Sequence, residues 1–148
     1  NLVPICGTCN LVKRANKKIF ASPFDRNINW DDEIQFKFPD LETTPGFVEI
    51  HAENRAKNNI RELKIQEAYQ VHEIEIKEIA EKAQAYNASQ LDEFKSVLGD
   101  NSLTRAEVKK LIFGDEITPE RMKTMPLGRM IRDLERELGV YGNEKIDK

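Results

Sequence analysis

The segment EIQFKF at residues 33–38 is followed by the loop PDLETTPG at residues 39–46 and then by FVEI at residues 47–50. Apolar and polar side chains alternate along the first segment, and this period of two with aromatic enrichment predicts a β-strand. The prolines and the glycine of the loop favour a reversal of the chain. These 18 residues therefore predict an antiparallel β-hairpin, with residues 47–50 as the returning strand.

A helical pattern follows the hairpin. Helices are expected over residues 53–63, 67–86, 89–98 and 127–138, with a break at 64–66 and frayed residues at 140–148. Thr104 and Glu107 have the spacing of a capping box, in which each side chain satisfies a backbone amide at the start of a helix. Thr118 before Pro119 indicates another helix start. The apolar stripes of these helices are expected to be packing surface. They are Ala56, Ile60 and Leu63; Val71, Ile74, Ile79 and Ala83; Leu91, Phe94 and Leu98; Leu127, Ile131, Leu134 and Leu138; and the methionines Met122, Met125 and Met130.

The expected fold class is therefore α+β, with a hairpin followed by a predominantly helical region. We expect a division into residues 1–50 and residues 51–148. Before the hairpin, residues 1–20 predict a short helix entered from a turn, and residues 21–32 predict an ordered loop held by Phe24 and Trp30.

The bulk composition narrows the class of protein. No apolar run approaches the roughly 18 residues that a membrane-spanning helix needs, so we expect a cytoplasmic protein without membrane contact. The net charge is −3, but residues 1–30 carry +4, which leaves −7 on the remaining residues. A basic end on an acidic body is typical of a phosphate-binding surface, and it is equally compatible with a solvated helix face.

Cys6 and Cys9 form the chain's one C-x-x-C pair. A disulfide scaffold would need more cysteines spread along the chain. The pair can be half of a zinc site, a redox pair, or two thiols without a metal. The redox interpretation needs a surrounding parallel sheet that the sequence does not offer, and half of a zinc site is therefore favoured.

The opening segment carries the most specific motif. Residues 1–13 read NLVPICGTCNLVK, and the pattern N-L-x-P-x-C-x-x-C-N-x-x-K resembles the second half of the zinc-stapled HNH endonuclease motif. In that family two strands and a helix form a ββα-metal finger, and an upstream C-x-x-C completes the structural zinc site. The histidine that activates water lies on the first strand of the finger. The resemblance implies that this histidine and the upstream cysteines precede Asn1, so the chain is expected to be catalytically incomplete alone.

The resemblance assigns a role to each matching residue. Asn1 corresponds to the middle asparagine that orients the catalytic histidine, and Cys6 and Cys9 correspond to the second pair of zinc ligands. Asn10 takes the position of the final ligand of the catalytic metal, and an amide oxygen suits Mg²⁺ or a similar divalent ion. Asn10 as a simple helix cap is the alternative. The phosphate-contacting residues would be Lys13, extended by Arg14, Lys17 and Lys18.

A looser resemblance to certain bacterial HNH proteins covers much of the remaining chain. It consists of the loop Ser22–Asp25, the helix segment Leu63–His72 with Tyr69, and the end piece Pro126–Leu134. The end piece departs from the family pattern at Gly128 and Arg129. The two histidines, His51 and His72, are expected to be packed or surface residues, not the catalytic base.

The resemblance therefore implies a bacterial, metal-dependent endonuclease that cleaves DNA in defence against foreign DNA, with RNA as the less favoured substrate. The alternative is that the helical region is an interaction module that binds a partner protein or a second copy of the chain.

Overall fold

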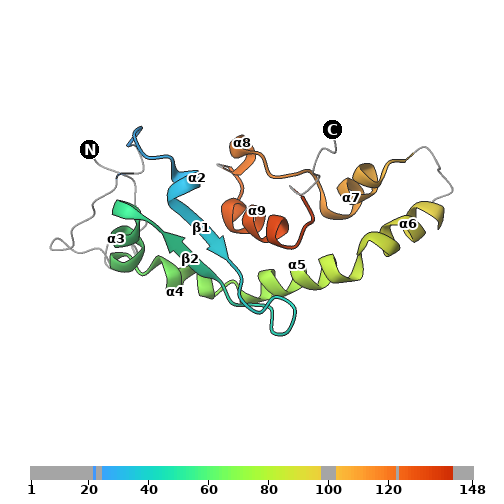
Figure 1. The fold of residues 1–148 in the computed structure, drawn as a ribbon, viewed down its shortest axis with the longest axis horizontal. Coiled ribbons are helices and arrows are strands. Elements are labelled where there is room, and N and C mark those ends of the chain that lie inside the picture. The colour runs from blue at the N-terminus through green and yellow to red at the C-terminus, as the bar shows by residue number, and fades with distance from the viewer. Residues whose placement is uncertain (1–21, 23–24, 98–102, 123, 142–148) are drawn as a thin grey trace.

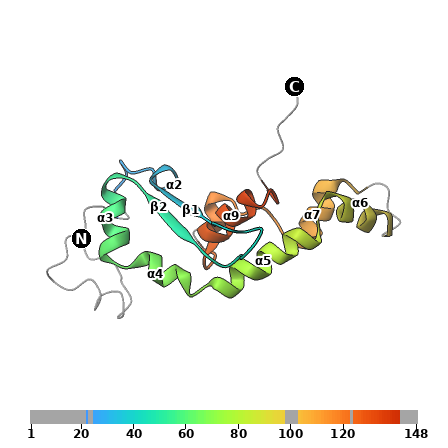
Figure 2. The same cartoon turned by 60° about the horizontal axis from the view of Figure 1, so that its bottom comes forward.

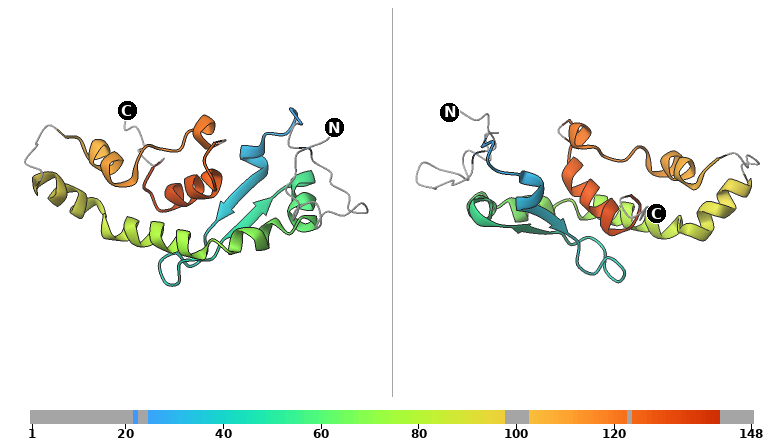
Figure 3. Two further views of the ribbon diagram at one scale, coloured as in Figure 1. Left: turned by 180° about the vertical axis from the view of Figure 1, so that it is seen from behind. Right: turned by 45° about the horizontal axis from the view of Figure 1, so that its top comes forward.

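The computed structural model describes residues 22, 25–97, 103–122 and 124–141. The helix predicted over residues 1–20 lies outside these residues, as do Phe24 and residues 142–148. In the described part the chain is elongated: a β-hairpin and the helix α9 occupy one half, and a helical hairpin occupies the far end (Figure 1). The two views of Figure 3 show the same separation of the two ends. The predicted α+β class with a mainly helical C-terminal region is confirmed.

The hairpin consists of β1 (Ile34–Lys37) and β2 (Glu49–Ala52), which pair antiparallel with Ile34 opposite Ala52 and Lys37 opposite Glu49. The hairpin was predicted correctly, but the returning strand begins and ends two residues later than residues 47–50. Continuing the register would place Pro39 opposite Phe47 as the next hydrogen-bonded pair. Proline has no N–H to donate, so the ladder ends at Lys37.

The loop predicted over residues 21–32 is corrected at its end, because Trp30–Glu33 forms the one-turn helix α2 directly before β1. Glu33 therefore ends a helix instead of opening the strand. The backbone amide of Glu33 donates to the carbonyl of Asn29 at 3.0 Å, and the carbonyl of Glu33 accepts from Glu53 at 3.0 Å. This second bond extends the pairing of the two chain segments one step beyond the strands.

The helical region contains more breaks than predicted. Helix α3 (Asn54–Glu62) agrees with the prediction, but the expected single helix over residues 67–86 is two helices, α4 (Ile65–Gln70) and α5 (Glu73–Ala85). The predicted stripe is wrong at Val71 and Ile74, whose exposed fractions are 73% and 68%. The break at residues 71–72 rotates α5, so that Ile76 and Ala80 are buried instead.

The remaining helices follow the predicted starts closely. They are α6 (Ala88–Val97), α7 (Arg105–Phe113), α8 (Pro119–Met122) and α9 (Gly128–Glu137). The capping box is confirmed: the amide of Glu107 donates to Thr104 Oγ1 at 3.2 Å, and the amide of Thr104 donates to Glu107 Oε2 at 2.7 Å. Fraying was predicted from residue 140, and this is wrong for Val140, which is buried, and for Tyr141, whose hydroxyl donates to the carbonyl of Gly114.

One hydrophobic core joins the hairpin to the helices. Its buried members come from both strand regions, α5 and α9: Phe36, Phe38, Val48, Ile76, Met130 and Leu134. Of the three methionines expected to pack, Met130 is fully buried, and Met122 and Met125 are half-buried.

Figure 2 shows α4 along the β2 side of the hairpin and α9 along the β1 side. The division of the chain near residue 50 stays a prediction. None of the described helices is long and apolar enough to cross a bilayer.

Candidate functional site

The residues predicted to carry the chemistry all precede the described part of the chain. Asn1, Cys6, Cys9 and Asn10, and the basic residues Lys13, Arg14, Lys17 and Lys18, lie in residues 1–21, outside the described residues. Their roles therefore stay predictions. We call residues 1–21 the motif segment and the described residues the body. The structure describes the body, to which the motif segment is attached.

The motif segment joins the body through a short turn. The amide of Asn27 donates to Asp25 Oδ1 at 3.0 Å, and the amide of Asp25 donates to the carbonyl of Ser22 at 2.9 Å. An aspartate that accepts from a backbone amide two residues later forms an Asx turn. Asp25, the last residue of the loop in the looser resemblance, thus fixes the direction in which the chain runs into α2 and β1.

The outer edge of β2 is closed by two glutamine side chains of α4. Gln66 Oε1 accepts from the amide of Ile50 at 2.7 Å, and Gln66 Nε2 donates to the carbonyl of Val48. Gln70 repeats this arrangement: its Oε1 accepts from the amide of Val48 at 3.3 Å and its Nε2 donates to the carbonyl of Gly46 at 3.1 Å. Each primary amide thus takes the place of a peptide unit in a third strand.

Gly46 is required where the loop reaches α5. Its φ is +132°, and a Cβ atom there would lie 2.6 Å from Cγ of Glu73. A side chain at this position would therefore push the loop away from α5. The carbonyl of Gly46 accepts the hydrogen bond from Gln70 Nε2 described above.

The outer edge of β1 is closed by two side chains of α9. The guanidinium of Arg129 donates to the carbonyl of Ile34, and Asp133 Oδ2 accepts from the amide of Phe36 at 3.2 Å. The other oxygen of Asp133 accepts from Arg132 Nη2 at 2.9 Å, and the exposed fractions of these two side chains are only 7% and 13%. Each of the two edges of the hairpin is therefore hydrogen-bonded by two polar side chains from one helix, α4 on the β2 side and α9 on the β1 side.

The two departures in the end piece have local explanations. The role of Arg129 in the structure is that of an N–H donor to a carbonyl, which a lysine ammonium also provides. A Cβ atom on Gly128 would lie 3.0 Å from the carbonyl oxygen of Met122. This close backbone approach favours glycine at position 128.

The helix segment with Tyr69 and His72 packs against the hairpin. The ring centroids of Tyr69 and Phe36 are 4.8 Å apart, and burial raises the pKa of the Tyr69 phenol, with the charge of Arg129 acting in the opposite direction. His72 Nδ1 lies 3.2 Å from Glu75 Oε1, and the exposed fraction of its side chain is 29%. Tyr69 is thus a packing residue between α4, β1 and α9.

His51 lies on β2 with its side chain largely exposed, and its Nε2 is 3.3 Å from Glu49 Oε2. Throughout residues 22, 25–97, 103–122 and 124–141, no three histidine, cysteine or acidic side chains are grouped so as to hold a metal ion.

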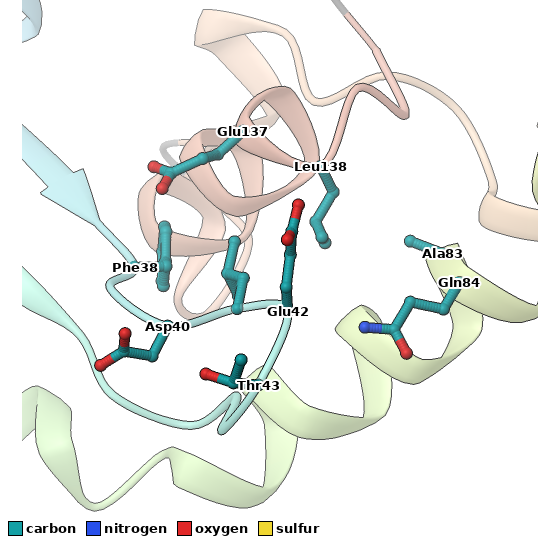
Figure 4. Close-up of a pocket in the computed structure, with 9 residues that line it drawn as sticks. Phe38, Asp40, Glu42, Thr43, Ala83, Gln84, Glu137 and Leu138 are labelled. Atoms are coloured by element: carbon teal, nitrogen blue, oxygen red, sulfur yellow. The ribbon is translucent and has the colours of Figure 1, made fainter.

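Open grooves flank the hairpin. One, about 880 Å³, lies between β2, α3 and α4 and is lined by Ile50, His51, Ala52, Glu53, Lys57, Asn58, Ile60, Arg61, Gln66 and Glu67. A second, about 570 Å³, lies between the hairpin loop, α5 and the end of α9. Figure 4 shows Asp40, Glu42 and Glu137 around this second groove, with Leu138 and Ala83 along its wall.

Glu135 is buried on α9, with an exposed fraction of 8%. Desolvation raises the pKa of its carboxyl to about 7, and Glu116 adds to the rise while Arg121 and Lys82 oppose it. Glu135 therefore changes its charge near neutral pH, on the side of α9 that contacts α8.

The residues that close the hairpin edges were not singled out as functional from the sequence. Gln66 and Gln70, like Arg129 and Asp133, are spaced i,i+4 on a helix, and this spacing was the available signal.

No protein-family model, no curated protein and no solved structure matches the chain.

Proposed function

We propose that this chain belongs to an HNH-type endonuclease that hydrolyses phosphodiester bonds of DNA with a divalent metal ion. The observation that carries the proposal is the 13-residue motif Asn1–Lys13, in which the asparagines, the C-x-x-C pair and the lysine all have the spacing of the finger's second half. On this proposal, Cys6 and Cys9 hold structural zinc and Asn10 contributes to the catalytic metal site. The bound metal would stabilise the charge that develops on the phosphate oxygens.

The described body supports the proposal through the residues of the looser resemblance. Tyr69, Arg129 and Asp133 are each engaged with β1, the strand that follows the motif segment. Residues far apart in the sequence thus converge on the hairpin that follows the proposed finger.

The test is conversion of supercoiled plasmid by the protein expressed from its whole gene, with Mg²⁺, Mn²⁺ or Ni²⁺. The proposal predicts nicked or linear product that EDTA prevents and that Asn10→Ala strongly reduces. Lys95→Ala, an exchange on α6 at the far end of the molecule, is the control and should leave the rate unchanged. Intact plasmid with all three metals would contradict the proposal.

A second candidate function is a protein-interaction module in the helical region. The observation that favours it is the exposure of apolar side chains on α6 and α7, with Val97 exposed to 78% and Leu111 to 66%. The test is the molar mass in solution. A dimer that Leu111→Ser dissociates would support this candidate, and a monomer that no partner binds would contradict it.

A further inference from the structure

The helix α3 and the motif segment are attached at the same end of the hairpin. Ile34, at the start of β1, pairs with Ala52, at the end of β2, and Glu53 then bonds to Glu33 before α3 begins. The chain that leads from residues 1–21 enters at this end through Ser22 and α2. Figure 1 shows α2 and α3 at this end of the hairpin, far from α6 and α7.

Helix α3 contributes Lys57, Asn58 and Arg61, together with the apolar Ile60, to the wall of the groove of about 880 Å³. Lys57 and Arg61 are one helical turn apart, so both side chains lie on one face of α3. Arg61 Nη2 donates to Asn58 Oδ1 at 2.6 Å, and Arg61 Nε donates to Glu62 Oε1 at 3.1 Å. These bonds hold the guanidinium at the wall, although 73% of the side chain is exposed.

The charge of this segment differs from that of the body around it. Residues 53–64 hold four basic and two acidic residues, whereas residues 31–148 as a whole carry −7. Glu62, one of the two acidic residues, pairs with Arg61. Two acidic residues also line the groove: Glu53 at the end of β2 and Glu67 on α4. An anion would be repelled on those sides, so the favourable surface for it is the α3 wall.

We propose that the α3 wall, formed by Lys57, Asn58 and Arg61, binds the sugar–phosphate backbone of duplex DNA. This inference rests on the proposed nuclease function and deepens it, since the wall would extend the phosphate contacts of the motif segment across the adjoining part of the body. Exposed lysine and arginine side chains supply the sequence-independent part of DNA affinity by releasing counterions from the phosphates. A guanidinium in addition offers paired N–H donors to a phosphate.

The test is the affinity for a fluorescein-labelled DNA duplex, measured by fluorescence anisotropy over a range of salt concentrations. The protein is expressed from its whole gene, and Ca²⁺ replaces Mg²⁺. The variant Lys57→Ala/Arg61→Ala is expected to bind more weakly and to lower the slope of log K against log salt by about 2, one for each lost phosphate contact. Lys57→Arg/Arg61→Lys keeps both charges and should keep the slope.

The matched control is Lys95→Ala/Lys110→Ala, which removes the same charge from α6 and α7 and is expected to leave the slope unchanged. An unchanged slope and affinity in Lys57→Ala/Arg61→Ala would overturn the inference, and so would an equal loss in the control or no DNA binding by the unaltered protein. The two proposals fail separately. DNA binding that depends on α3 without cleavage would contradict only the nuclease, and cleavage with α3-independent binding would contradict only the inference.

Discussion

The backbone amide of Phe36 donates to Oδ2 of Asp133 at 3.2 Å, across 97 residues of sequence. This bond belongs to an arrangement in which α9 closes one edge of the hairpin and α4 closes the other. Unpaired strand edges are sites of unwanted association, and proteins commonly cover them. Here the edges are satisfied by side chains that imitate a neighbouring strand.

The spacing of the four side chains follows from helix and strand geometry. Residues i and i+4 of a helix are about 6 Å apart along its axis, at 1.5 Å per residue. The outward-facing groups of a strand repeat every two residues, or about 6.7 Å. Gln66 and Gln70 therefore meet Ile50 and Val48, and α9 meets β1 in the same way.

The glutamines of α4 are expected to contribute to stability. Gln66→Ala or Gln70→Ala leaves a buried or half-buried backbone amide and carbonyl of the β2 segment without their partner, which costs about 1–3 kcal/mol of unfolding free energy. Urea unfolding measures the change. Gln90→Ala, an exposed exchange on α6, should stay within about 0.5 kcal/mol. If the α4 variants unfold at the same urea concentration as Gln90→Ala, the edge closure does not stabilise the fold.

Asp133→Ala is expected to destabilise the protein more strongly. It removes the acceptor of the Phe36 amide and the carboxylate paired with the buried Arg132, and loss of one partner of a buried ion pair costs about 3–5 kcal/mol. Asp92→Ala breaks the ion pair with Arg105, but both of those side chains are more than half exposed, and the midpoint should barely move. Equal effects of the two substitutions in thermal unfolding would argue against a buried role for Asp133.

Glu135 makes the stability depend on pH. Its pKa is raised in the folded state to about 7, so its contribution is fully present below the ordinary value of 4.5 and is lost as the pH rises through 7. Glu135→Gln should therefore stabilise the protein by roughly 1–3 kcal/mol at pH 8 and have little effect at pH 4. The measurement is urea unfolding at both pH values, with Glu78→Gln, on the exposed side of α5, as the control. A constant effect of Glu135→Gln across this range would contradict the assigned titration.

Zinc content tests the cysteines directly. The protein expressed from its whole gene is expected to retain zinc through dialysis, and Cys6→Ser/Cys9→Ser is expected to lose it, because a structural site needs four ligands. Elemental analysis by mass spectrometry gives the metal-to-protein ratio. The same ratio in the double variant and in the unaltered protein would exclude these cysteines as ligands.

Local signals in the sequence predicted much of the fold. The alternation Ile34, Phe36, Phe38 identified β1, and the spacing of Thr104 and Glu107 identified the start of α7, because both signals arise within a few residues. The break between α4 and α5 was not predicted. The Val71–Ile74–Ile79–Ala83 stripe is compatible with one helix, whereas in the structure Gln66 and Gln70 of α4 bond to the β2 segment and the chain turns before α5 begins.

The candidate sites likewise divide into those that short sequence motifs predict and those that long-range contacts create. The motif Asn1–Lys13 is recognised from adjacent residues, whereas the partners of Phe36 and Ile50 come from distant helices. The α3 wall could not be predicted from the sequence either. The register of the hairpin places Lys57 and Arg61 at the end where the motif segment joins. Long-range placement of this kind has no signature in a short window of sequence.

The central claim, a metal-dependent nuclease, is tested most directly by the single-turnover rate of cleavage of a labelled DNA duplex in Mg²⁺. The unaltered protein and Asn10→Ala, both expressed from the whole gene, are compared at saturating protein concentration. The account predicts cleavage that EDTA abolishes and that Asn10→Ala slows at least about tenfold, as loss of a residue at a metal site does. No cleavage by the unaltered protein, or an equal rate in Asn10→Ala, would contradict it.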